Sequence, residues 1–180
     1  MATLQYSTAN TEGIDFDATY TAYDQSAAIS STNSPDNPGP PFQVGTTVKG
    51  TGDSDFVFIK ATAAVTSGDL VRMSATWDSS GATTSNALFG DLLGVAVASI
   101  ASGSYGWVQR AGYVTGGVRA VTNIQPNVQL YATTDAGVVS STSTTGNKTL
   151  LGIKLTATAS SSAAGTTAIL NYPAVGATTT

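Results

Sequence analysis

Two Asp-x-Asp motifs are the closest pairs of groups in the sequence that could carry out acid–base chemistry or bind a metal ion. Asp15 and Asp17 lie in the segment GIDFDA, and Asp53 and Asp55 lie in GTGDSD. Glycoside hydrolysis requires paired carboxylates, and carboxylates are also preferred ligands of Ca²⁺. Neither motif has the spacing of a calcium-binding loop. We therefore interpret both pairs as solvent-facing turn residues and predict no metal site.

The other common catalytic groups are missing. The sequence contains neither histidine nor cysteine, which rules out Ser-His-Asp and Cys-His sites, thiolate metal sites and disulfides. The segment SGSYG at 102–106 does not have the spacing of a nucleophile elbow, and GTG at 50–52 lacks the third glycine of a dinucleotide-binding motif. A Ser-Lys dyad is compatible with the composition, although nothing distinguishes one serine from the others. We predict a protein that is not an enzyme and needs no cofactor.

Charge and hydropathy argue against nucleic-acid and membrane partners. The net charge is −4 and the seven Lys and Arg residues are scattered, which leaves no basic patch for phosphate groups. A membrane-spanning helix needs about 20 apolar residues, and the apolar run at 92–101 is about half that length. The first residues, MATLQYSTANTEG, lack the basic and apolar regions of a secretion signal.

The elements that would position these residues are predicted to be strands. From Gln43 onward, β-branched and aromatic runs such as FVFIKATAAV and LVRMSA alternate with turn residues, a pattern typical of strands. The segment 92–101 contains two valines, an isoleucine and Gly94, so we expect a buried strand there rather than a helix. The sequence predicts an all-β fold, a compact β-barrel or β-sandwich of short antiparallel strands.

Two segments, 65–110 and 123–172, resemble each other, which predicts two similar halves. Leu93-Gly94-Val95 aligns with Leu151-Gly152-Ile153, and each copy would close with a strand, at 105–109 and 167–172. A coincidence of composition is the alternative. We place the β domain at 44–173 and expect a flexible C-terminal tail at 174–180.

Alternation along the expected strands predicts which residues form the core. Leu93, Val95 and Val97 would share a bulky face, whereas Gly94 and Ala96 would share a thin face that another layer can approach closely. The complete set of predicted core anchors is Leu93, Val95, Val97, Trp107, Leu151 and Ile153.

Residues 1–43 differ in composition from the rest of the chain. They end in NSPDNPGPPF, whose prolines forbid a helix or a central strand. The segment is either a floppy terminus or an extended arm that becomes ordered on a partner, and its apolar and aromatic residues favour the arm. The side chains expected to anchor this arm are Tyr6, Ile14, Phe16, Tyr20 and Tyr23.

A succession of phrases between residues 55 and 172 resembles a known family. DFVFIKATAAVTSGDLV, LLGVAVASIASGSYGWVQRAG, QLYATTDAGVV and LLGIKLTATASSSAAGTTAILNYP are similar to phrases of the small decoration, or cement, proteins of tailed-bacteriophage heads. The N-terminal arm takes no part in this resemblance.

The resemblance implies a structural virion protein. Such a protein would be made in the host cytoplasm, bind the exterior of the capsid and stabilise contacts between major capsid protein subunits. On this interpretation the N-terminal arm binds the capsid, through Tyr6, Ile14, Phe16, Tyr20 and Tyr23. It would associate with itself as a homotrimer, with a dimer as the alternative. A different reading of the same features is another virion or surface β module, such as a fibre base, a tail component or a carbohydrate-binding knob.

Overall fold

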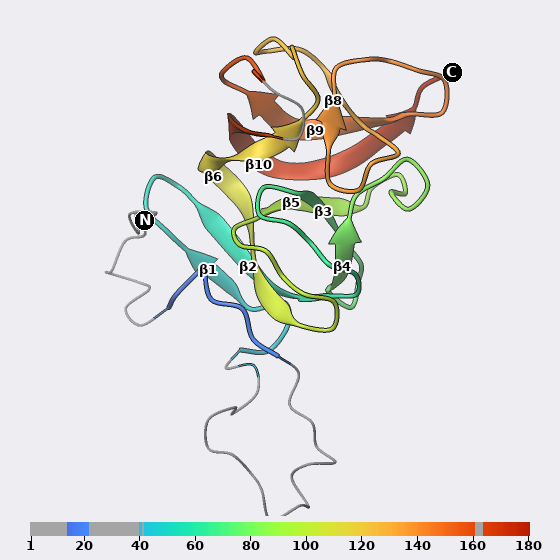
Figure 1. The fold of residues 1–180 in the computed structure, drawn as a ribbon. Helices are drawn as coiled ribbons and strands as arrows, with labels where there is room; N and C mark the ends of the chain where they lie inside the picture. The colour runs from blue at the N-terminus through green and yellow to red at the C-terminus, as the bar shows by residue number, and fades with distance from the viewer. Residues whose placement is uncertain (1–13, 22–39, 41, 161–163) are drawn as a thin grey trace, which may run out of the picture.

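The β-branched and aromatic runs of the sequence form strands, separated by turns in which Gly, Asn and Asp adopt positive φ angles. The structure, a computed structural model, describes residues 14–21, 40, 42–160 and 164–180. These residues contain ten strands and no helix, which confirms the predicted all-β class (Figure 1). The strands are β1 (Thr47–Lys49), β2 (Asp55–Ala61), β3 (Leu70–Met73), β4 (Asp78–Gly81), β5 (Leu92–Ala96), β6 (Tyr105–Ala120), β7 (Leu130–Ala132), β8 (Val139–Ser140), β9 (Lys148–Leu155) and β10 (Ala164–Thr178).

Strand pairing closes into two rings that share β6. In the first ring, the order is β2-β4-β3-β5-β6, and β6 pairs back with β2. In the second ring, the order is β6-β8-β7-β9-β10, and β10 pairs back with β6. Each ring has one parallel pair, β2–β4 or β6–β8, and four antiparallel pairs. The same pairing pattern therefore occurs twice along the chain.

Two strands are much longer than the short strands expected from the sequence. β6 has 16 residues and β10 has 15. The first part of β6 pairs with β2 and the rest pairs with β10, and Ala111 is a register partner in both pairs. Gly112 follows with φ +89°, and a Cβ there would lie 2.7 Å from the Ser54 hydroxyl. A glycine is needed at this point, where β6 leaves one ring and enters the other.

The expected flexible tail at 174–180 is wrong for most of its length. β10 continues to Thr178, and Val175 and Thr178 are register partners of Leu150 and Lys148 in β9. The side chain of Val175 is also buried. The small residues of this segment suggested a loose end, but they fit close packing against β9 instead.

The interior of each ring is apolar. Val57, Ile59 and Val108 belong to the core cluster of the first ring, whereas Val118, Leu155 and Leu170 belong to that of the second. β5 separates the two clusters, because Leu93 and Val95 pack into the second while Ala96 packs into the first. The bulky face predicted for β5 therefore packs into the second cluster, and the thin face packs into the first. Val97 lies beyond the end of β5 and is only partly buried.

Leu151 is not a core residue, although Ile153 is. The side chain of Leu151 is 51% exposed, whereas the adjacent Leu150 is 2% exposed. Gly152, which lies between Leu151 and Ile153, has φ +68°. The pairing of β9 with β10 shifts register at the same point. This bulge breaks the alternation of faces, so that Leu150 and Ile153 both point inward. Gly94, with which Gly152 aligns in sequence, lies in a regular strand without a positive φ.

Candidate interaction surfaces

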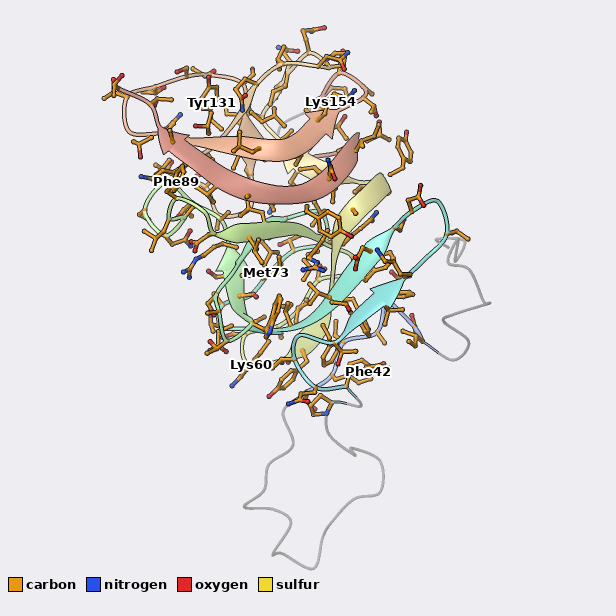
Figure 2. The ribbon with its side chains drawn as sticks, turned by 180° about the vertical axis from the view of Figure 1, so that it is seen from behind. Phe42, Lys60, Met73, Phe89, Tyr131 and Lys154 are labelled. Atoms are coloured by element: carbon orange, nitrogen blue, oxygen red, sulfur yellow. The ribbon has the colours of Figure 1, made fainter. Side chains whose placement is uncertain are left out.

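Aromatic side chains cover the outer face of the β2–β6 pair. We call the aromatic cluster the set Phe16, Tyr20, Phe42, Phe56, Phe58, Tyr105 and Trp107. The ring of Phe16 lies 4.2 Å from that of Phe56 and 5.3 Å from that of Trp107, centroid to centroid. The ring of Phe42, which is labelled in Figure 2, lies 5.1 Å from that of Trp107, centroid to centroid. Trp107 is 1% exposed and therefore lies in the core.

Phe16 is part of this core and is not an anchor for a partner. Its side chain is fully buried, which leaves it no surface to offer. Tyr20 and Tyr105 exchange backbone hydrogen bonds of 2.9 and 2.7 Å, an isolated antiparallel bridge that attaches Tyr20 to the start of β6. Ile14 and Tyr20 pack partly buried on the same cluster. The other two expected anchors, Tyr6 and Tyr23, lie outside the described residues.

The two Asp-x-Asp motifs do not form a common site. In the first, the backbone N–H of Asp17 donates to the carboxylate of Asp15 at 3.0 Å, which is a local turn. Burial, assisted by the negative charge of Asp15, raises the pKa of Asp17 and also that of Tyr20. In the second motif, Asp53 is exposed whereas Asp55 is buried, so the two carboxylates have different surroundings.

Asp55 lies at the centre of a polar group of side chains where β6 bends. We call Lys49, Asp55, Arg110 and Tyr172 the ionic joint. Oδ2 of Asp55 accepts hydrogen bonds from Lys49 Nζ at 3.0 Å and from the Tyr172 hydroxyl at 2.7 Å, and Arg110 lies 3.7 Å from Oδ1. The hydrogen bond to Asp55 raises the pKa of Lys49. Because these residues come from β1, β2, β6 and β10, the ionic joint ties the two rings together.

Gln109 supports the same bend. Its side-chain amide donates to the carbonyl oxygens of Ala111 at 2.9 Å and of Tyr113 at 3.2 Å. These bonds link the side chain to the carbonyls on either side of Gly112, where β6 passes from one ring to the other. The bend is therefore fixed by side chains, and we interpret its polar residues as structural.

Four exposed apolar side chains gather where β5, β9 and β10 meet. We call Leu88, Phe89, Leu92 and Leu151 the apolar surface. Leu92 and Leu151 are both register partners of Ala174, so they lie on one face on either side of β10. Phe89 is 79% exposed and lies close to the end of β10 (Figure 2).

The loop that carries Leu88 and Phe89 is held in place. Gly90 donates to the carbonyl oxygen of Val175 at 2.8 Å, and Val175 donates to that of Asp91 at 2.9 Å. The carboxylate of Asp91 also accepts hydrogen bonds from the Leu88 backbone and from Arg72, both at 2.8 Å. Exposed apolar side chains on a fixed scaffold are typical of a site for a macromolecular partner.

The described part of the chain shows no group of three or more acidic side chains that could hold a metal ion. In the same residues, no helix is long and apolar enough to cross a membrane.

Sequence reasoning missed both the ionic joint and the apolar surface. Asp55 and Tyr172 are 117 residues apart, and only the ring closure brings them together. The apolar surface did leave a signal, because Leu88 and Phe89 are adjacent large apolar residues within the otherwise small and polar loop TTSNALFGD.

Comparison with protein-family models matches residues 49–170 to a family described as phage cement protein. The match runs from the end of β1 into β10. No curated protein matches the sequence.

Proposed function

Because this match covers more than half of its 180 residues, the chain belongs to the phage cement protein family, and we propose that it binds the outer surface of a phage head. There it would stabilise contacts between neighbouring major capsid protein subunits. The family match is the observation that carries this proposal. The net charge of −4 supports it, because an acidic protein suits the exterior of a capsid better than the DNA-filled interior. On this proposal the protein is made in the host cytoplasm and ends in the virion.

The apolar surface is the part of the molecule that we assign to the capsid contact. Leu88, Phe89 and Leu151 are each at least half exposed in the free chain, and burying them against a capsid subunit would remove apolar area from water. The mechanism requires no reaction, since a protein that contacts two neighbouring subunits holds them together by its binding energy alone.

Self-association is a further part of the proposal, as a homotrimer or alternatively a dimer. Joining several copies multiplies the number of weak contacts with the shell, so that the assembly binds more tightly than one copy.

The role proposed for the N-terminal arm needs revision. Phe16 is buried in the aromatic cluster, and Ile14 and Tyr20 pack partly buried against it. The other two expected anchors, Tyr6 and Tyr23, lie outside the described residues. Deleting residues 1–13 would leave in place the contacts that the described residues of the aromatic cluster make with one another. We expect this truncated protein to keep its melting temperature and to bind heads more weakly. Unchanged binding would remove residues 1–13, including Tyr6, from the mechanism.

Binding to purified expanded heads tests the proposal. We expect the wild-type protein to co-sediment with heads at a fixed number of copies and to raise their resistance to heat. The variants Phe89→Ser and Leu151→Ser should bind at least about tenfold more weakly, as is typical of central interface residues. Tyr131→Ser, a substitution in β7 outside the apolar surface (Figure 2), is the matched control. A wild-type protein that stays in the supernatant, or heads equally robust without it, would contradict the proposal.

A further inference from the structure

A groove lies between the turn that joins β1 to β2 and the outer face of β6 and β10. Its volume is about 490 Å³, within the range of small-molecule sites. Ala111, Gly112 and Leu170 are among the residues that line it, together with the aromatic residues Tyr113 and Tyr172. These tyrosines are 49% and 47% exposed. The turn and Phe89 lie on opposite sides of the molecule in Figure 2, so the groove is separate from the apolar surface.

Tyr172 is held rigidly in this groove. Its hydroxyl donates to the buried carboxylate of Asp55, and the Arg110 guanidinium lies 5.4 Å from the centre of its ring. The backbone of Tyr172 has φ +46°, a conformation that an aromatic residue adopts only when its surroundings enforce it. The ionic joint therefore fixes the orientation of one aromatic wall before any ligand arrives.

Two polar side chains in the groove are available to a ligand. Asp53 and Asn171 line it, both are exposed, and neither side chain has a hydrogen-bond partner within the described part of the chain. A carboxylate and an amide together can accept and donate hydrogen bonds. The groove thus combines aromatic faces with free hydrogen-bonding groups.

Among the described residues, the charges that line the groove balance. Lys49 contributes a positive charge and Asp53 a negative charge, and Arg110 and Asp55 beside them lie 3.7 Å apart as an ion pair. Such a site attracts neither phosphate nor a cation strongly, which favours an uncharged ligand.

On the equivalent face of the first ring, apolar aromatic side chains are covered by other apolar aromatic side chains. There, Phe56, Phe58 and Trp107 receive Phe16 and Phe42. The groove instead presents tyrosines together with an amide and a carboxylate, so it fits a molecule with one apolar face and hydroxyl groups around its edge. A hexopyranose has this character, since its C–H face can lie on a tyrosine ring while its hydroxyls bind polar side chains.

We propose that this groove binds a hexopyranose unit of a neutral glycan, with Tyr113 and Tyr172 as the stacking rings and Asp53 and Asn171 as the hydrogen-bonding groups. Lys49 and Asp55 act as positioning residues that hold Tyr172. This activity is separate from capsid binding and does not depend on it. A particle decorated with the protein would then adhere weakly to glycan surfaces through many copies.

Titration of the ¹⁵N-labelled protein with the methyl glycosides of glucose, galactose, mannose and N-acetylglucosamine, followed by amide chemical shifts, tests this inference. At least one sugar should give saturable shifts confined to residues 49–53, 111–113 and 169–172, with a dissociation constant on the order of 1 mM for so small a ligand. Saturable shifts in none of the four titrations, or shifts centred on Leu92 and Leu151 instead, would overturn it.

Variants separate stacking from a merely structural role. Tyr113→Ala and Asn171→Ala change exposed side chains and should weaken binding at least about fivefold while leaving the melting temperature nearly unchanged. Tyr131→Ala is the control for loss of a tyrosine elsewhere and should bind normally. Sugar binding that survives both groove substitutions would contradict the assignment. Head binding by these variants should equal that of the wild type, which keeps this test distinct from that of the capsid contact.

Discussion

The outer faces of two equivalent strand pairs differ in what covers them. On the β2–β6 pair, Phe58 and Trp107 are cross-strand partners and both are buried beneath aromatic residues of the N-terminal segment. On the β6–β10 pair, Tyr113 and Ile169 are cross-strand partners and both are about half exposed. The pairing pattern is repeated but the cover is not. Ring closure therefore sets the fold, whereas the presence or absence of a cover decides which face is available for binding.

The largest effect should come from removing the cover of the first face. Phe16→Ala would leave a cavity against Phe56 and Trp107 and should lower the free energy of unfolding by about 3–5 kcal/mol. Ile169→Ala, on the open face, should cost less than about 1 kcal/mol, because its side chain is already 41% exposed. Chemical denaturation followed by tryptophan fluorescence measures both. Equal losses would mean that the two faces do not differ in packing.

The next effect concerns the ionic joint, which lies between the two faces. Asp55→Asn would leave Lys49 and Arg110 without their anionic partner and should lower the free energy of unfolding by about 1.5–3 kcal/mol. Lys154→Gln, a substitution of an exposed lysine on the outer face of β9, should change it by less than about 0.5 kcal/mol. Denaturation curves with unchanged slopes would show that stability alone is altered. An Asp55→Asn variant as stable as the wild type would contradict the role of this carboxylate in joining the rings.

A smaller effect is expected at the bulge that exposes Leu151. In Gly152→Ala, the new Cβ would lie 2.5 Å from the carbonyl oxygen of Asn171, in a backbone with φ +68°. We expect a loss of about 1–3 kcal/mol from strain and backbone displacement. Gly146 has φ +92° but open space around it, so Gly146→Ala should cost only about 1 kcal/mol. If the two variants melt at the same temperature, the close contact at Gly152 is not decisive.

The sequence predicted the features that depend on local pattern. The all-β class, the burial of Trp107 and the opposite facing of Val95 and Ala96 follow from residue type and alternation. Leu151 was misassigned because Gly94 and Gly152 look alike in sequence, and only the pairing partner decides which one adopts a positive φ. The prediction for Phe16 was wrong because the sequence around an aromatic residue does not show whether the ring packs in the protein's own core or against a partner. The ionic joint depends on contacts distant in sequence, which no local pattern encodes.

The smallest effect concerns pH and the segment that covers the first face. The pKa of Asp17 is raised in the folded chain, so the folded state binds its proton more tightly than the unfolded state does. Its contribution to stability therefore falls as the pH rises from about 4, the usual pKa of the group, through the raised value. Asp17→Asn should be slightly more stable than wild type at pH 7, by less than about 0.5 kcal/mol, and the difference should vanish near pH 3. A variant less stable than wild type at pH 7 would contradict this sign.

A reconstruction of heads decorated with this protein, by electron cryomicroscopy, tests the central claim most directly. The account predicts density at fixed lattice positions, with Leu88, Phe89, Leu92 and Leu151 against the major capsid protein and the Tyr113–Tyr172 groove open to solvent. Density in which the apolar surface faces solvent while another face of the protein contacts the shell would contradict it.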